Sequence, residues 1–294
     1  MEKRTSDLFN WGFDASSKRY LPGQPFGEPV VTAQVDLEIA GKRLVFGAPV
    51  EFRYADDIRG EVRRDLNIVP AASVEMDQPL LIVPYSTKPQ TRQITMSVTN
   101  NSSMNVLSNP YIKIAGNVKL TSSEGWKMPE PSSAFDLKKS GEKFTTTFDL
   151  TIPGGTKPGS YRLNGEATVT GRLTESHTET FSTTMRTLSY PHIQTHRIYQ
   201  PATAEVKVIA LKTNLLKVGY LAGSGDRVPD AMAQMGFGVG TINEKMLSSG
   251  DLSRFQVIVV GIRAYQVRPD IVANNRRLLD FANAGGTLIV QYQL

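Results

Sequence analysis

Two short loops hold the residues with the strongest case for chemistry. The first loop follows an apolar run at 216–222 and precedes a helix-like segment at 228–235, a position where backbone N–H groups can hold an anion. The second loop follows the apolar run at 257–262. If both runs are parallel strands, the loops meet at the carboxyl edge of one sheet, where open α/β sheets bind ligands. The candidate ligand-binding residues are Gly223, Ser224, Gly225, Asp226, Arg263 and Tyr265.

Both loops also have a purely structural interpretation. Glycine permits a tight turn, Asp226 can cap the helix that follows, and Pro229 suits an early helical position. The first loop lacks the third glycine of the dinucleotide-binding fingerprint, which favours this structural interpretation. Arg263 can pair with Asp226 or Asp270 at the surface, and for the second loop both interpretations stay open.

Trp126 is a candidate for carbohydrate stacking, because flat aromatic faces pack on the C–H surfaces of sugar rings. Trp11 and Tyr111 are further aromatic residues of this kind. A position in the core of a β-sandwich is the commoner fate of tryptophan. Basic residues do not alternate with aromatic ones, so the sequence predicts no nucleic-acid platform.

The sequence indicates no metal site and no covalent nucleophile. Its histidines are His177, His192 and His196. The last two lie in what reads as extended chain, which places them about 13 Å apart, too far to bind one metal ion. The chain has no Cys and no G-x-S-x-G motif. We therefore expect no catalytic residue, no metal and no cofactor in this chain itself.

Charge and hydropathy narrow the class of protein. There are 33 basic and 28 acidic residues, a net charge of +5, and the basic residues are spread along the chain. This pattern does not favour a nucleic-acid partner. The longest apolar runs are far shorter than the roughly 20 residues of a membrane-spanning helix, so no membrane span is expected. The first residues continue into polar positions such as Asp7 and Asn10, so no signal peptide is expected either.

The elements that position these residues are of two kinds. From 31 to 39 apolar residues alternate with polar ones, the period of a strand with one buried face. Short strands of this kind continue to about residue 200, with Pro, Gly, Asn and Ser between them, which favours antiparallel sandwiches. Beyond residue 205, apolar strands alternate with helical spacing, which is typical of a parallel, doubly wound sheet.

The predicted fold class is therefore multidomain: antiparallel, Ig-like β-sandwich units followed by a partial α/β doubly wound domain of flavodoxin-like or class I amidotransferase-like type. The expected divisions are a polar N-terminal segment at 1–24, a small β domain at 25–72, an Ig-like sandwich at 73–200 and the α/β domain at 206–294. A doubly wound sheet normally has about five or six strands, and 206–294 supplies about four. We therefore expect a truncated domain in a fragment, with self-association through the unpaired sheet edge.

Several short blocks occur in a distinctive order along the chain. The earlier blocks are 27–33, 49–54, 60–64 and 69–70, followed by Gly125-Trp126 with Phe135, Gly141, Glu142, Thr146, Phe148 and Pro153. The later blocks are 190–193, 218–220, 225–226, 228–229, 261–265, 275–279 and 285–288. In this order they resemble the region downstream of the catalytic domain in large bacterial PIG-L-type (LmbE-like) deacetylases, with an Ig-like sandwich and a final glutamine-amidotransferase-like region.

The resemblance implies a zinc-dependent N-acetyl-sugar deacetylase whose zinc ligands are outside this chain. The amidotransferase nucleophile would be a Cys after the strand at 287–292, where this chain has Gln291 and Tyr292. The implied function is a non-catalytic accessory fragment that positions a glycan or the neighbouring deacetylase domain, with zinc only in that missing domain and an extracytoplasmic parent protein. Two alternatives stay open: a small-ligand-binding or sensing module using the two loops, and a purely structural spacer.

Overall fold

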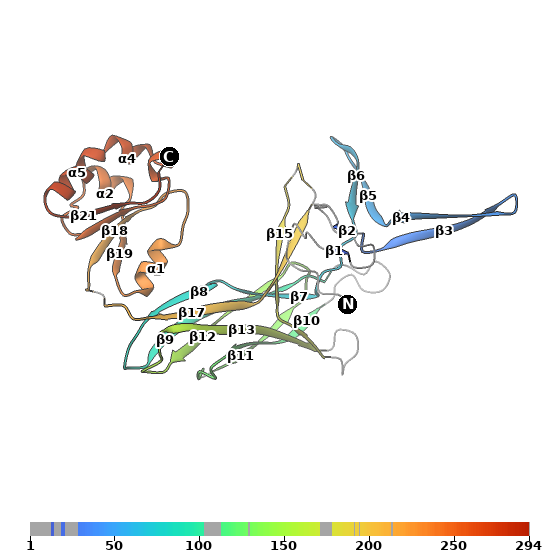
Figure 1. Cartoon of the computed structure of the whole chain (residues 1–294), viewed down its shortest axis with the longest axis horizontal. Helices are drawn as coiled ribbons and strands as arrows, with labels where there is room; N and C mark the ends of the chain where they lie inside the picture. Colours follow the sequence, from blue (N-terminus) through green and yellow to red (C-terminus); the bar gives the residue numbers. More distant parts are fainter. Residues whose placement is uncertain are drawn as a thin grey trace.

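The computed structural model describes residues 13–14, 19–20, 29–102, 113–128, 130–170, 178–190, 192–193, 195–212 and 214–293. The protein is mostly β, with 51% strand and 13% helix. Figure 1 shows exposed two-stranded ribbons at one end, a β-sandwich in the middle and a small parallel sheet with short helices at the other end.

The middle part is a sandwich of two sheets. One sheet has the order β11-β10-β13-β17-β8, with β14 also paired to β13, and the facing sheet has the order β12-β9-β7. The strands are β7 (Ala72–Met76), β8 (Leu80–Pro84), β9 (Gln90–Asn100), β10 (Ile114–Ser122), β11 (Ser132–Leu137), β12 (Lys143–Ile152), β13 (Gly159–Thr170), β14 (Thr178–Phe181) and β17 (Thr203–Ile209). All pairs are antiparallel except β8 with β17, which is parallel. The expectation of an Ig-like β-sandwich is confirmed here.

Alternation along the strands builds the core between the two sheets. In β12, Phe148, Leu150 and Ile152 are buried while the intervening side chains face outward. The outward Thr147 lies beside Thr95 of β9, with 3.2 Å between their hydroxyl oxygens. One face of each sheet is therefore apolar and the other polar, the usual solution for an antiparallel sandwich.

The residues before the sandwich form ribbons rather than a second sandwich. β3 (Thr32–Ile39) pairs with β4 (Lys42–Pro49), and β5 (Glu51–Asp56) pairs with β6 (Gly60–Asp65). Every residue of β3 and β4 is exposed. The expectation of a sandwich in each β unit is therefore wrong for this part: the alternating pattern forms strands, but among the described residues no second sheet packs on them. Two further antiparallel pairs are β1 (Phe13–Asp14) with β2 (Arg19–Tyr20), and β15 (Thr183–Leu188) with β16 (His196–Pro201).

The last part is a four-stranded parallel sheet in the order β19-β18-β20-β21. The strands are β18 (Lys217–Leu221), β19 (Gly238–Thr241), β20 (Val257–Val260) and β21 (Thr287–Val290). The helices are α1 (Val228–Gln234), α2 (Glu244–Ser249), α3 (Ala264–Val267), α4 (Pro269–Ala273) and α5 (Asn275–Asn283). Val228 and Met232 of α1 pack with Tyr220 on one face, and Leu278 and Phe281 of α5 lie in the core of the other face.

The predicted fold class is wrong in its α/β doubly wound part. The protein is mostly β-sandwich, and no flavodoxin-like or amidotransferase-like doubly wound domain is evident in it. The expectation depended on apolar strands that alternate with helical spacing. A short parallel sheet with helices of four to nine residues satisfies that local pattern without the extent of a doubly wound domain.

Helix α1 joins the parallel sheet to the sandwich. The side-chain carbonyl of Gln234 accepts a hydrogen bond of 2.6 Å from the backbone N–H of Ile82 on the edge strand β8. At the other end of the helix, Arg227 donates to the carbonyl of Asp77 at 2.8 Å. The two parts are therefore held by direct contacts as well as by the connecting chain.

Leu150→Ala tests the sandwich core, because Leu150 is completely buried. We expect the free energy of unfolding to fall by about 2–5 kcal/mol, the cost of lost apolar burial plus a residual cavity. The measurement is urea denaturation followed by the fluorescence of Trp126 in a Trp11→Phe background. Leu215→Ala is the matched control, because Leu215 is 92% exposed, and it should change stability by less than about 0.5 kcal/mol. Equal effects of the two changes would contradict this description of the core.

Candidate functional site

The carboxyl edge of the parallel sheet brings the two predicted loops together. β18 ends at Leu221 and β20 at Val260, and because the strands are parallel both loops leave the same edge. The backbone N–H of Ser224 donates to the carbonyl of Ile262 at 2.9 Å. A Cβ on Gly223 would lie 2.0 Å from that same carbonyl oxygen, so only glycine fits there. This close approach packs the first loop directly against the second.

Asp226 is held by two hydrogen-bond donors in the protein. The hydroxyl of Tyr220 lies 2.6 Å from each carboxylate oxygen, and the backbone N–H of Val228 donates to Oδ1 at 3.0 Å. Tyr220 is only 3% exposed, and burial together with the hydrogen bond to Asp226 raises the pKa of its phenol. Gly225 has φ +101°, which favours glycine and turns the chain toward α1. These contacts support the structural interpretation of the first loop.

In the second loop, Arg263 and Tyr265 lie in different environments. Arg263 is an exposed residue with φ 54°, and its backbone N–H donates to Tyr292 at 2.8 Å. The hydroxyl of Tyr265 donates to Asn275 at 2.6 Å, and burial raises the pKa of this phenol. The hydroxyl of Tyr265 is therefore hydrogen-bonded within the fold, whereas the charged side chain of Arg263 is exposed to solvent.

The predicted ion pair of Arg263 with Asp226 or Asp270 is not formed. Asp226 accepts from Tyr220, and Asp270 is paired with Arg268, with 3.1 Å between Arg268 Nε and Oδ1. The Arg268 guanidinium holds the pKa of Asp270 below its usual range. Within the part of the chain that the structure describes, the guanidinium of Arg263 makes no ion pair. The role of the six loop residues in ligand binding stays a prediction.

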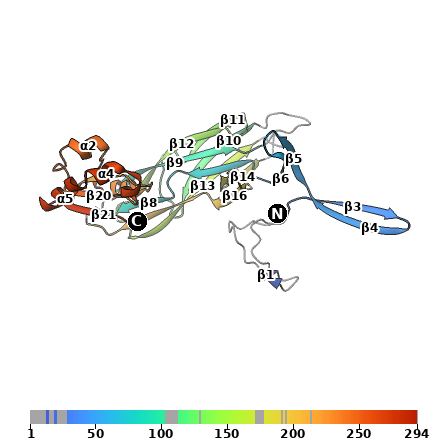
Figure 2. The same ribbon diagram turned by 90° about the horizontal axis from the view of Figure 1, so that it is seen from above.

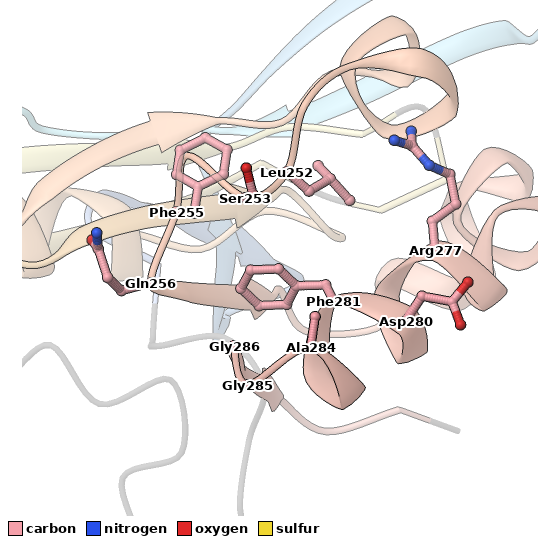
Figure 3. Close-up of a pocket in the computed structure, with 10 residues that line it drawn as sticks. All are labelled: Leu252, Ser253, Phe255, Gln256, Arg277, Asp280, Phe281, Ala284, Gly285 and Gly286. Atoms are coloured by element: carbon pink, nitrogen blue, oxygen red, sulfur yellow. The ribbon is translucent and has the colours of Figure 1, made fainter.

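A shallow cavity of about 440 Å³ lies at the opposite, amino edge of the sheet (Figure 3). Phe255 and Phe281 line it, next to Gly285 and Gly286 before β21. Arg277 also lines it, but its guanidinium donates to the carbonyls of Leu247 and Gly250 at the end of α2. The charge is therefore used to hold that helix end. The sequence analysis did not predict this cavity.

Trp126 lies in the sandwich core. It is 8% exposed, and its ring centroid is 5.0 Å from that of Tyr161. This position corresponds to the structural alternative of a core tryptophan, and the carbohydrate-stacking role of Trp126 stays a prediction. Trp11 and Tyr111 lie outside the described residues.

The next observations concern the positions of the histidines and the length of the helices. His192 has its ring centroid 6.0 Å from that of Tyr190, His196 is in β16, and His177 lies outside the described residues. Among the residues that the structure describes, no three His, Cys, Asp or Glu side chains are grouped to hold a metal ion. No described helix is long and apolar enough to cross a membrane.

Residues 86–170 match the model of a family described as NPCBM-associated, NEW3 domain of alpha-galactosidase. This segment is less than a third of the chain and lies within the sandwich. No curated protein matches the chain. The resemblance to PIG-L-type deacetylases and to amidotransferases is therefore wrong, because the match and the mostly β fold point elsewhere. The blocks that suggested it are short and rich in Gly, Pro and alternating apolar residues, which turns and strands of unrelated β proteins share.

Several solved structures have a distant likeness to the chain. A family 123 glycoside hydrolase from Clostridium perfringens has 11% identity and a TM-score of 0.25, over 66% of this chain and 38% of that one. A PapD-like domain of human CEP192 has 12% identity and a TM-score of 0.24, over 50% and 92%. The beta-glucuronidase 2 of Bacteroides uniformis has 13% identity and a TM-score of 0.22, over 83% and 24%. At these TM-scores the likeness carries no argument about function.

Tyr220→Phe tests the contact that fixes the first loop. We expect a loss of about 1–3 kcal/mol in unfolding free energy at neutral pH, because the Asp226 carboxylate loses its buried donor. Since the pKa of Tyr220 is raised above its unfolded value near 10, this stabilisation is complete below about pH 10 and declines as the pH rises further. Urea denaturation from pH 7 to 11 measures it, and the advantage of the unmodified chain should shrink at the alkaline end. Tyr292→Phe, at an exposed tyrosine, is the control; identical curves for the two variants would refute the assignment.

Proposed function

We propose that this chain is a non-catalytic accessory segment of a glycan-acting enzyme, in which the Ig-like sandwich positions the parts attached to it. The observation that carries the proposal is the match of residues 86–170 to the NEW3 domain of alpha-galactosidase. The matched residues extend from the loop before β9 to the end of β13, and these two strands are interior strands of the two facing sheets. The likeness therefore includes the structural core of the sandwich rather than one loop.

The arrangement of the parts supports a positioning role. Figures 1 and 2 place the β3–β4 ribbon and the parallel sheet at opposite ends of the sandwich. The chain enters the sandwich at β7 and leaves it at β17, which pairs in parallel with β8. A sandwich packed to a continuous core resists bending, so it can keep its two ends at a fixed separation.

The joint between the sandwich and the parallel sheet is reinforced at α1. The connecting residues near 210–216 are largely exposed and include Leu211 and Leu215. A connector of this composition alone would allow the parts to move independently. The hydrogen bonds of Gln234 to Ile82 and of Arg227 to Asp77 limit that movement. The pair of contacts is what makes a spacer of defined length possible.

This joint can be tested by measuring a distance across it. The chain has no Cys, so Thr145→Cys on β12 and Lys245→Cys on α2 give two unique sites for spin labels. We expect one narrow distance distribution in pulsed electron resonance. Adding Arg227→Ala and Gln234→Ala should broaden it, because both joint contacts are lost, whereas Gln266→Ala at an exposed position should not. A distribution already as broad without these changes would contradict a fixed spacer.

The accessory assignment has its own test, independent of the joint. We expect the purified chain to release no p-nitrophenol from p-nitrophenyl α-galactoside or from the corresponding β-galactoside and N-acetylglucosaminide. The assay is absorbance of the released phenolate, with an active glycosidase as positive control. Turnover that increases with the concentration of the chain, and is lost on its thermal unfolding, would show that the chain is itself an enzyme.

A further inference from the structure

The β3–β4 ribbon has one continuous apolar face. Residues directly opposite each other on paired strands share a face, and three such pairs are Ala33 with Ala48, Val35 with Phe46 and Leu37 with Leu44. Ile39, opposite Lys42, extends this face to the tip of the ribbon. All of these residues are exposed. Apart from Lys42 at the tip, this side of the ribbon is therefore apolar and open.

The opposite face of the ribbon is mainly polar. It carries Gln34, Asp36, Glu38 and Arg43, with an ion pair of 3.1 Å between Arg43 and Asp36. Val45, opposite Asp36, is the one large apolar side chain of the ribbon on this face. Because this face is mainly polar and the other is apolar, the apolar face is the one that gains from being covered. An isolated two-stranded ribbon is marginal in water and needs a third layer or strand on its apolar face. Figures 1 and 2 show that the ribbon extends away from the sandwich, so none of the described parts of the chain supplies that layer.

The sizes of the side chains along the face match a second copy of the same ribbon. From base to tip, the layers are two small alanines, then Val35 with Phe46, then Leu37 with Leu44, and finally Ile39. A two-fold axis through the middle places the base of one ribbon over the tip of the other. The alanines then face the layer of Ile39 and Lys42, and the layer of Phe46 faces that of Leu44. Sheets pack about 10 Å apart, which requires this alternation of large and small side chains.

The area and the charge of the apolar face are consistent with a second copy of the ribbon as its partner. Its exposed apolar side chains amount to roughly 500 Å² per copy, as large as the largest patch on a typical monomer. Two copies would cover roughly 1,000 Å² before the rim is included, close to the lower limit of about 1,200 Å² for a stable interface. The face has one charged residue, Lys42 at the tip, whose ammonium can extend past the edge into water. A partner recognised by charge has nothing to bind on this surface.

We propose that two copies of this chain associate through the apolar faces of their β3–β4 ribbons, in antiparallel orientation, to form a closed two-fold dimer. This inference is independent of the accessory function, because it uses only the ribbon. It also differs from self-association through the edge of the parallel sheet, where Ile289, Val290 and Tyr292 are exposed. A contact between that edge and the ribbon would be heterologous and would form open chains instead of a dimer.

Sedimentation of the full chain over a hundredfold concentration range tests the proposal. Phe46 and Val45 are adjacent, each is 54% exposed, and they lie on opposite faces of the ribbon. We expect a monomer–dimer equilibrium in which Phe46→Lys raises the dissociation constant at least about a hundredfold, because the change occurs twice in a symmetric interface. Val45→Lys and Ile289→Lys should leave it within about threefold. A monomer at all concentrations, a dimer that survives Phe46→Lys, or a dimer lost with Ile289→Lys would overturn the proposal.

Cross-linking tests the orientation and does not require a destabilising change. Chains with Ala33→Cys and chains with Ile39→Cys are mixed and treated with a bismaleimide that spans about 10 Å, the distance between facing sheets. With the two kinds of chain mixed in equal amounts, random pairing alone gives about twice as much mixed product as either product of a chain with itself. The antiparallel arrangement predicts a mixed product far above this ratio, because Ala33 of one copy faces Ile39 of the other. Fluorescence of Trp126 confirms that the sandwich stays folded in each variant. A mixed product at or below about twice the yield of either self-product, the ratio for random pairing, would rule out the antiparallel two-fold arrangement.

Discussion

The parallel pairing of β8 with β17 is the contact on which the arrangement of the chain depends. β7 belongs to one sheet of the sandwich, and only a few residues later β8 belongs to the other. This crossing ties the two sheets together at the start of the sandwich, and β17 then closes it from the other end of the sequence. It also leaves β8 as an edge strand whose N–H groups need partners. Gln234 supplies one of them, so the helix that completes the sandwich edge is part of the next unit.

The same requirement to cover strands is met very differently along the chain. In the sandwich, two sheets cover each other, and in the parallel sheet helices lie on both faces. The β3–β4 ribbon has neither, although its pattern is as regular as that of any buried strand. A regular apolar face is costly to maintain in water. The exposed apolar face of the β3–β4 ribbon therefore favours a covering layer from outside the described fold.

The sequence predicts local structure here much better than it predicts what packs on what. Alternation at 31–39 correctly indicates a strand, observed as Thr32–Ile39, but the inference of a buried face fails because no second layer is present. The meeting of the loops at 223–226 and 261–263 was predictable, since parallel strands end at one edge. The use of Asp226 by Tyr220 was missed, although a tyrosine near the end of an apolar strand and six residues before a carboxylate was a usable signal. The family resemblance failed because turn and strand residues recur in unrelated β proteins.

The loops at the carboxyl edge show that the same residue types can serve a binding site and a structural turn. Gly223 and Gly225 are residue types that an anion-binding turn uses, and together with Asp226 they are also those that a tight turn and a helix start use. In this fold all three residues have structural roles. Gly223 allows the two loops to touch, Gly225 turns the chain, and Asp226 accepts a hydrogen bond from the hydroxyl of Tyr220. Arg263 is the exception, since its charge is directed outward while its backbone holds the loop to Tyr292. Of the six candidate residues, Arg263 is the one whose cationic side chain is exposed at this edge, whereas the ribbon offers a whole apolar face.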